Sequence, residues 1–451
     1  MHSSFITKPD TWAACDGLGR LLPTYDQVGD LRPDKFIGIF YFLWAENEAG
    51  FKTGPYDVTK ILATAGGNLI NATWGPLYGF HHWSQPYLNY YLMDDEFVIR
   101  KHAQMLADAG VDTLILDATN AFTYDNIWSK IANIYIDMRL KSMRTPKFCF
   151  ITWSSSEQTV RKLYENLYSQ NLYRDLWFFW NDKPLILANP DGFPSDLLNF
   201  FTIRESWAWT KGQAWFGDGR NKWPWIDNYP QGRGLNESGQ LEQTCVTVAG
   251  HPVMNIGRSF DGPTQHEPDQ INPMIGTYFS QQWEQALKID PSFIFVTGWN
   301  EWIAQRFVQT SSTNSFIGKQ WPIGTTFFVD EFIQEYSRDI EPMFGGHGDN
   351  YYYQLINYIR RFKVDLGENQ LKKNMNNTSN WQYEETIQIV NSGYNELHFS
   401  LSYQSLKINN TKINLQFKWL SADVLYTFDP LNFIDKGDSA PNGRFTYTYM
   451  I

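Results

Sequence analysis

Between about residue 36 and about residue 305, short apolar runs alternate with segments of helical periodicity. Such alternation is typical of repeated strand–helix units, in which parallel strands are covered by helices. About seven or eight strand candidates occur here, which a (β/α)8 barrel accommodates. They are 36–44, 111–117, 147–153, 176–180 with 184–188, 200–203, 244–249 and 293–298, while 255–259 is the doubtful one.

Helical signals lie between these runs. The acidic residues Asp94, Asp95 and Glu96 favour the start of a helix, and Gly110 is expected to end it. Further helices are expected over 124–143, 157–170 and 276–287. The predicted fold class is therefore α/β, a (β/α)8 TIM barrel that occupies residues 1–345.

The pattern changes after about residue 350. The segments 386–390, 398–403, 413–419 and 424–428 alternate with the period of half-buried strands, and Asn-rich turns separate them. A helix over 351–362 is expected to connect them to the barrel. Residues 346–451 are thus predicted to form a connector and a smaller β-sandwich domain. This domain is either a carbohydrate-binding module or a structural sandwich, and the sequence favours neither.

Composition narrows the classes of partner. The formal net charge of −11 argues against nucleic acid or an anionic membrane as the main partner. Aromatic residues make up 17% of the chain, an excess that fits proteins that handle carbohydrates. Three widely spaced cysteines imply neither a disulfide framework nor a zinc site. No phosphate-binding loop is present, and no cofactor is expected.

The run from Phe293 to Trp302 reads as a buried strand that ends in a polar pair, Asn300 and Glu301, between two tryptophans. In a parallel barrel, residues at the carboxyl ends of strands point into the mouth where chemistry occurs. Apolar surroundings raise the pKa of a carboxyl group and suit it to proton transfer. Glu301 is therefore the first catalytic candidate; its alternative role is to cap a neighbouring loop.

Hydrolysis of a glycosidic bond needs a second carboxyl group. Asp117 closes an apolar strand and is the predicted partner, although it could instead tie down the turn at Thr119 and Asn120. Glu205 is a weaker candidate, because Arg204 beside it could neutralise it. Asp227 lies in the long aromatic segment 211–239, and segments of that kind on barrels normally build the substrate site.

Further residues are predicted to bind substrate because they follow strands or lie in aromatic loops. For Trp153, wall packing is the alternative; for Arg258, it is a pair with Asp261. Adjacent histidines point in different directions, so one of His81 and His82 is expected to be structural, and no third ligand completes a metal site. The predicted binding residues are Asn300, Trp302, His81, His82, Trp153, Asp227, His251, Arg258, Trp44, Asn120 and Glu205.

The run from Val296 to Trp302 resembles the strand-end motif of glycoside hydrolase family 99 and its family 71/99-like relatives. These are (β/α)8 barrels that include endo-α-mannosidases. The segments 38–44, 109–112, 183–187 and 223–225 add to the resemblance, which covers roughly residues 36 to 345. In family 99 the motif continues Glu-Trp-His-Glu, with both glutamates catalytic. Here Glu301 matches the first glutamate and Ala304 replaces the second.

The expected function is a glycoside hydrolase that cleaves a polysaccharide or glycan, with Glu301 and Asp117 as the acid and base. Ala304 favours a second possibility, a non-catalytic carbohydrate-binding barrel. A glycosyltransferase-like enzyme is a third, although no phosphate cradle supports it. No signal peptide is visible in this chain, but scattered N-glycosylation sequons permit a secreted, periplasmic or cell-surface location.

Overall fold

The computed structural model describes residues 12–24, 30–45, 55–264, 267–312 and 315–365, together with four C-terminal strands. The chain divides into two units, residues 1–375 and 376–451. Among the residues that the structure describes, no helix is long and apolar enough to cross a membrane.

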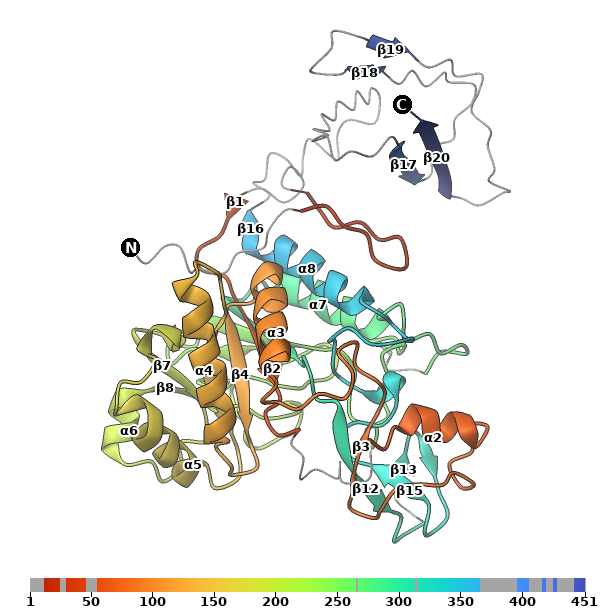
Figure 1. The fold of residues 1–451 in the computed structure, drawn as a ribbon. Coiled ribbons are helices and arrows are strands. Elements are labelled where there is room, and N and C mark those ends of the chain that lie inside the picture. The colour runs from red at the N-terminus through yellow and green to blue at the C-terminus, as the bar shows by residue number, and fades with distance from the viewer. Residues whose placement is uncertain are drawn as a thin grey trace. The chain divides into compact units, whose positions relative to one another are not determined.

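The first unit is built on a curled nine-stranded sheet that is mostly parallel (Figure 1). Seven strands pair in parallel in the order β8-β7-β5-β4-β2-β11-β10, and two short antiparallel strands, β6 and β9, pair with β7 and β10. The bounds are β2 (Phe36–Tyr41), β4 (Thr113–Ala118), β5 (Lys147–Thr152), β6 (Phe179–Trp180), β7 (Lys183–Leu187), β8 (Thr202–Arg204), β9 (Gly234–Leu235), β10 (Leu241–Thr247) and β11 (Phe293–Thr297).

The two ends of this sheet are linked through the aromatic segment. Isolated backbone bridges join Glu205 to Lys222 and Arg220 to Leu235 of β9. Arg204 of β8 also forms a buried ion pair with Glu242 of β10, with 2.6 Å between Nε and Oε2. This arrangement is consistent with a TIM-like barrel, as the alternation of strands and helices predicted.

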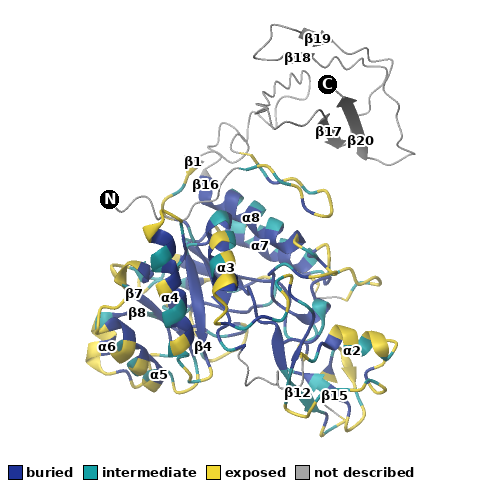
Figure 2. Ribbon diagram, in the orientation of Figure 1, coloured by how far each residue is buried: buried dark blue, intermediate teal, exposed yellow. Residues whose placement is uncertain are grey.

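Helices cover the outer face of the sheet (Figure 1). Figure 2 shows buried strands inside and exposed residues on the outward faces of α3 to α6. Asp95 caps α3, and Gly110 ends it at φ 90°, a left-handed conformation that glycine adopts without strain. The bounds are α3 (Glu96–Ala109), α4 (Asp125–Leu140), α5 (Ser156–Leu163) continued by a π-helical turn (Tyr164–Tyr168), a 3-10 turn (Arg174–Leu176), α6 (Ser195–Phe200), α7 (Thr277–Ile289) and α8 (Asn350–Lys363).

The parallel strands are apolar on both faces because helices cover one side and side chains fill the other. In β11 all five residues are buried, and in β4 all six are. The expected helix over 351–362 is α8, which contacts α3 and α7 in the first unit. A two-residue ladder pairs β1 (Asp30–Leu31) with β16 (Val364–Asp365) at the end of α8.

A smaller lobe within the first unit extends from the ends of the strands. It contains α2 (Val58–Thr64), the sheet of β15 (Thr326–Phe328), β12 (Ile303–Val308) and β3 (Phe80–His82), the hairpin β13 (Ser315–Phe316) and β14 (Lys319–Gln320), and a 3-10 turn (Gln334–Tyr336). A separate hydrophobic cluster, which includes Phe316, Phe328 and Phe332, holds it together.

Some expectations were wrong or lie outside the described residues. The doubtful strand at 255–259 is a turn-rich segment, with Asn255 at φ 53°. In the second unit, β17 (Glu396–Gln404) pairs with β20 (Asn442–Met450), and β18 (Gln416–Lys418) pairs with β19 (Leu425–Thr427). These two ladders do not establish a β-sandwich, and the expected strand at 386–390 lies outside the described residues.

Candidate active site

Glu301 lies in the connection between β11 and β12, beyond the carboxyl end of β11. It is 9% exposed and lines a cleft of about 910 Å³. Trp44, the segment from Asn120 to Asn126, the start of β12 and Asp330 form other parts of the cleft wall. A cleft of this size at this end of a parallel sheet is where a substrate is expected.

The neighbours of Glu301 in sequence are structural rather than exposed to the cleft. Asn300 accepts a hydrogen bond from the backbone N–H of Phe42 (2.9 Å) and donates one to the Phe42 carbonyl (3.3 Å). Trp302 stacks on Trp83 with 4.3 Å between centroids and donates to Glu341 at 2.6 Å. The predicted binding residues Asn300 and Trp302 therefore hold the backbone on either side of Glu301.

A second segment, 338–341, runs beside the end of β11. Gly298 donates to the Arg338 carbonyl at 2.9 Å, and Glu341 donates to the Trp299 carbonyl at 2.9 Å. A Cβ atom on Gly298 would lie 2.9 Å from Oδ1 of Asp339, so glycine leaves room for this carboxyl group. The pairing brings Asp339 close to Glu301.

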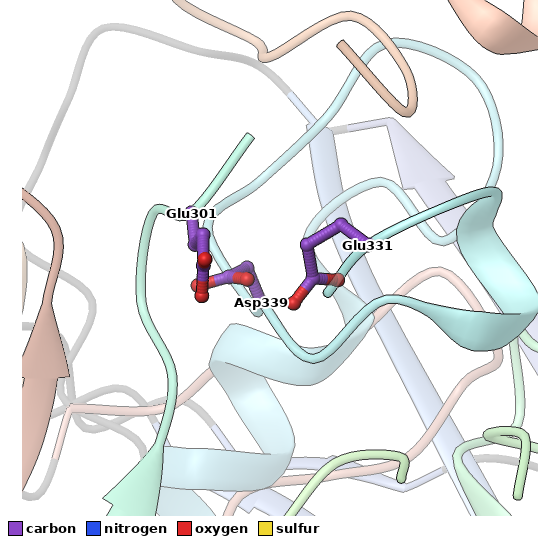
Figure 3. Close-up of side chains that lie close together, drawn as sticks. All are labelled: Glu301, Glu331 and Asp339. Atoms are coloured by element: carbon purple, nitrogen blue, oxygen red, sulfur yellow. The ribbon is translucent and has the colours of Figure 1, made fainter. Parts of the chain in front are cut away.

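Three carboxyl groups converge at this point: Glu301, Glu331 and Asp339 (Figure 3). One oxygen of each lies within 4.8 Å of the other two. Nη2 of Arg338 is 2.8 Å from Oε1 of Glu331 and 3.4 Å from Oε2 of Glu301. Asp339 is 1% exposed, and neither of its oxygens has a hydrogen-bond partner.

This cluster raises the pKa of its acids. Burial raises the pKa of Glu301 well above its usual range, the charge of Arg338 opposes the rise, and Glu331 and Asp330 add to it. Burial likewise raises the pKa of Glu331 and of Asp339. Three acids share one guanidinium, and burial together with the other acids favours the protonated form of Glu301.

The same three carboxyl groups are the one set among the described residues with the spacing of metal ligands. Oxygen ligands of a single calcium ion would have comparable separations. The guanidinium of Arg338 already lies against two of them. The positive charge that the structure places in this cluster is therefore Arg338.

Asp117 lies at the end of β4, as predicted, and is 3% exposed. Its Oδ1 accepts hydrogen bonds from the backbone N–H (2.9 Å) and the hydroxyl (2.7 Å) of Thr119, and its Oδ2 accepts one from Nε1 of Trp44 (3.2 Å). Burial raises the pKa of Asp117, and these hydrogen bonds only partly oppose the rise. Trp44 and the exposed Asn120 line the cleft, and Asp117 lies behind Trp44.

Trp153 and Trp207 form an aromatic pair at the ends of β5 and β8. Their rings are stacked, with centroids 4.0 Å apart and planes within 11°. Both side chains are half-buried, so part of each ring remains open to solvent. An aromatic surface of this kind suits the C–H face of a sugar ring.

The predicted histidines have separate environments. His81 is fully buried, accepts from the backbone N–H of Gly75 and contacts the Gly79 carbonyl, and burial lowers its pKa to about 4. Burial lowers the pKa of His82 to about 3. His251 instead lies near the cleft, where Nε2 is 3.5 Å from Oδ1 of Asp330.

Two other predicted residues organise the fold around the site. Asp227 accepts hydrogen bonds from Thr210, Asn228 and Gly232 and so shapes its own loop. Arg258 is fully buried and donates to the carbonyls of Ser337 (2.8 Å) and Asp339 (2.6 Å).

Two expected pairings were wrong. The ion-pair partner of Glu205 is Lys222, because Arg204 is engaged by Glu242 across the sheet. The hydrogen bonds of Arg258 go to backbone carbonyls, whereas Asp261 accepts from Thr264 and Gln281.

The sequence prediction missed Asp330, Glu331, Arg338 and Asp339. The sequence does contain a signal, because the strand-like segment Thr326–Phe328 (β15) and Val329 lead directly into Asp330 and Glu331. Glu301 follows β11 in the same way. The segment lies after the last strand of the expected barrel, so the barrel pattern does not point to it.

No known protein-family model matches the chain, and no curated protein matches it. Among solved structures it is similar to the GH99 endo-α-mannosidase from Bacteroides thetaiotaomicron, with 16% identity, a TM-score of 0.42, and coverage of 74% of this chain and 98% of that one. The complex of the Bacteroides enzyme with bis-tris-propane gives 13% identity, a TM-score of 0.41 and the same coverage. A glycoside hydrolase-like protein gives 12% identity, a TM-score of 0.41, and coverage of 75% of this chain and 96% of that one. The function of the chain is therefore inferred from the geometry of its site.

Proposed function

We propose that this protein is a glycoside hydrolase that cleaves a polysaccharide or glycan, with Glu301 as the general acid. The observation that carries the proposal is a carboxyl group that lines a cleft of about 910 Å³ and whose pKa is raised by burial. A general acid must hold a proton and must reach the leaving oxygen. The raised pKa of Glu301 and its place in the cleft wall support this role.

Other parts of the site support a carbohydrate substrate. Trp44 and Asn120 offer an aromatic surface and an amide in the cleft wall, and Trp153 with Trp207 offers a second aromatic surface. We interpret the curled sheet as a (β/α)8 barrel whose closing side is the segment 220–235. The proposal includes secretion of the protein and binding of carbohydrate by its C-terminal unit.

Glu301 needs a second carboxyl group on the other side of the scissile bond. Asp117 was the predicted partner, and its indole neighbour Trp44 lines the cleft. Ala304, which stands where the resemblance to family 99 places a second glutamate, lies in β12 and supplies no carboxylate.

The test is a screen of wild type and Glu301→Gln on a broad panel of polysaccharides, with reducing ends quantified and products weighed by mass spectrometry. Wild type is expected to release oligosaccharides, and Glu301→Gln is expected to release none while it keeps the wild-type circular dichroism spectrum. A protein that binds a glycan on the panel but releases no reducing ends would be a carbohydrate-binding barrel, and the hydrolase proposal would then be wrong.

A further inference from the structure

The second catalytic carboxyl must face the same space as Glu301, because the scissile bond lies between the two groups. Three acidic residues line the cleft among the described parts of the chain: Asp125, Glu301 and Asp330. Asp125 accepts hydrogen bonds from Nε1 of Trp128 (2.8 Å) and Nδ2 of Asn166 (2.8 Å) at the start of α4. Its oxygens are occupied by the local structure, which leaves Asp330.

Asp330 combines enclosure with access. It immediately follows β15 and Val329, lines the cleft, and has 55% of its side chain exposed to solvent. Nε2 of His251 lies 3.5 Å from its Oδ1. A water molecule that enters the cleft therefore has direct access to this carboxylate, whereas the oxygens of Asp117 are covered by Thr119 and Trp44.

The surroundings of Asp330 and Glu301 shift their pKa values in opposite directions, as a general base and a general acid require. The protein atoms around Asp330 withdraw it partly from bulk water and by themselves would raise its pKa, although more than half of the side chain is exposed. The contact with His251 and the charge of Arg338 outweigh this effect and lower the pKa. The pKa of Glu301 is raised, and so is that of Asp117. An acid and a base in one site are recognised by environments that push their pKa values apart. The pKa values of Glu301 and Asp117 shift in the same direction, whereas those of Glu301 and Asp330 shift in opposite directions, as an acid and a base require.

We propose that Asp330 is the second catalytic carboxyl of the cleft and acts as the general base opposite Glu301. This rests on the proposed glycoside hydrolase function. Asp330 takes a proton from a water molecule, whose oxygen bonds to the anomeric carbon. The bond from that carbon to the glycosidic oxygen breaks as this oxygen receives the proton of Glu301. One water is consumed; Asp330 ends protonated and Glu301 ionised, and proton exchange with solvent restores both.

The experiment compares Asp330→Asn, Asp117→Asn and Asp137→Asn on the polysaccharide that wild type cleaves. Loss of a general base typically reduces kcat by about 10²–10⁴-fold. Asp330→Asn is expected to fall in that range with KM little changed. The control Asp137→Asn, which removes a surface carboxylate of α4 that pairs with Lys141 and does not line the cleft, should stay within about threefold of wild type. Asp330→Gly should regain activity in sodium formate, because a small carboxylate can occupy the vacated space; a purely structural role would not be rescued.

A second measurement does not require turnover. Piperidine imino sugars of gluco, manno and galacto configuration carry a positive charge that a base carboxylate attracts, and their binding is measured by calorimetry. Asp330→Asn should weaken the tightest one at least tenfold, and Asp137→Asn should not. If Asp330→Asn cleaves normally while Glu301→Gln does not, the assignment of Asp330 is overturned and the hydrolase function stands. If wild type cleaves nothing, the hydrolase function fails; if it also binds no imino sugar, the assignment of Asp330 fails with it.

Discussion

The guanidinium of Arg338 lies 2.8 Å from the carboxylate of Glu331, and both side chains are almost completely buried. Removing the guanidinium leaves the buried carboxyl groups beside it without that hydrogen-bonding partner and costs about 1–3 kcal/mol. Arg338→Met should therefore lower the free energy of unfolding by about that amount in urea titrations. Arg361→Met, which removes a surface pair with Glu284, should cost at most about 1 kcal/mol. Equal losses in the two variants would contradict a stabilising role for the buried contact.

The buried acids make the free energy of unfolding decrease as pH rises above about 4.3. Burial raises the pKa of Glu331 in the folded state, so the folded protein binds a proton that the unfolded chain releases near its ordinary pKa of about 4.3. This contribution is complete below that value and is lost as pH rises through the raised folded-state pKa. Glu331→Gln should flatten the decline of unfolding free energy above pH 4.3, whereas Glu165→Gln at an exposed position should leave it unchanged.

His81 has the opposite effect: it makes the free energy of unfolding decrease as pH falls below 6.5. Its pKa is lowered to about 4 in the folded state from 6.5, so the unfolded chain takes up a proton first as pH falls. Stability is complete above pH 6.5 and declines as pH falls to about 4, by about 3 kcal/mol from this group. His81→Gln, whose amide can keep the contacts to Gly75 and Gly79, should remove most of that decline in urea titrations at pH 4 to 7. An unchanged acid limb would show that His81 is protonated in the folded protein.

Trp153 tests the aromatic surface at the ends of β5 and β8. If a sugar ring packs on the exposed part of the Trp153–Trp207 pair, Trp153→Ala should weaken glycan binding about tenfold, equivalent to about 1.4 kcal/mol. Trp177→Ala, in a fully buried tryptophan outside the cleft, should instead lower thermal stability. Calorimetric titration with the bound or cleaved glycan separates the two effects. Unaltered affinity in Trp153→Ala would assign this pair to wall packing.

Local patterns predicted the repeated units well. The structure confirms the acidic start and glycine end of α3 and the apolar strand β11. These features depend only on residues that are neighbours in the sequence. Glu301 was found for the same reason, because a polar residue directly after a buried strand is visible in sequence. The position of Asp117 at the end of β4 followed from the same reasoning.

Side-chain partners were harder to predict, because they depend on contacts between distant segments. Arg204 engages Glu242 rather than its neighbour Glu205, and this pairing exists only once the sheet curls. Asp339 lies beside Glu301 because the segment 338–341 pairs with the backbone of Gly298 and Trp299. The amide of Asn300 is directed at the backbone of Phe42, more than two hundred residues earlier in the chain. None of these orientations is encoded in nearby residues.

Asn300 is hydrogen-bonded to the backbone of Phe42, directly after β2, and Trp302 contacts Trp83 and Glu341. These contacts fix the backbone on both sides of Glu301. None of them involves the segment 120–126 or Asp330, which form other parts of the cleft wall. Substitutions in that wall can therefore alter the shape of the cleft without displacing Glu301. In evolutionary terms, a chain of this design can change the lining of its cleft while the carboxyl group of Glu301 stays fixed.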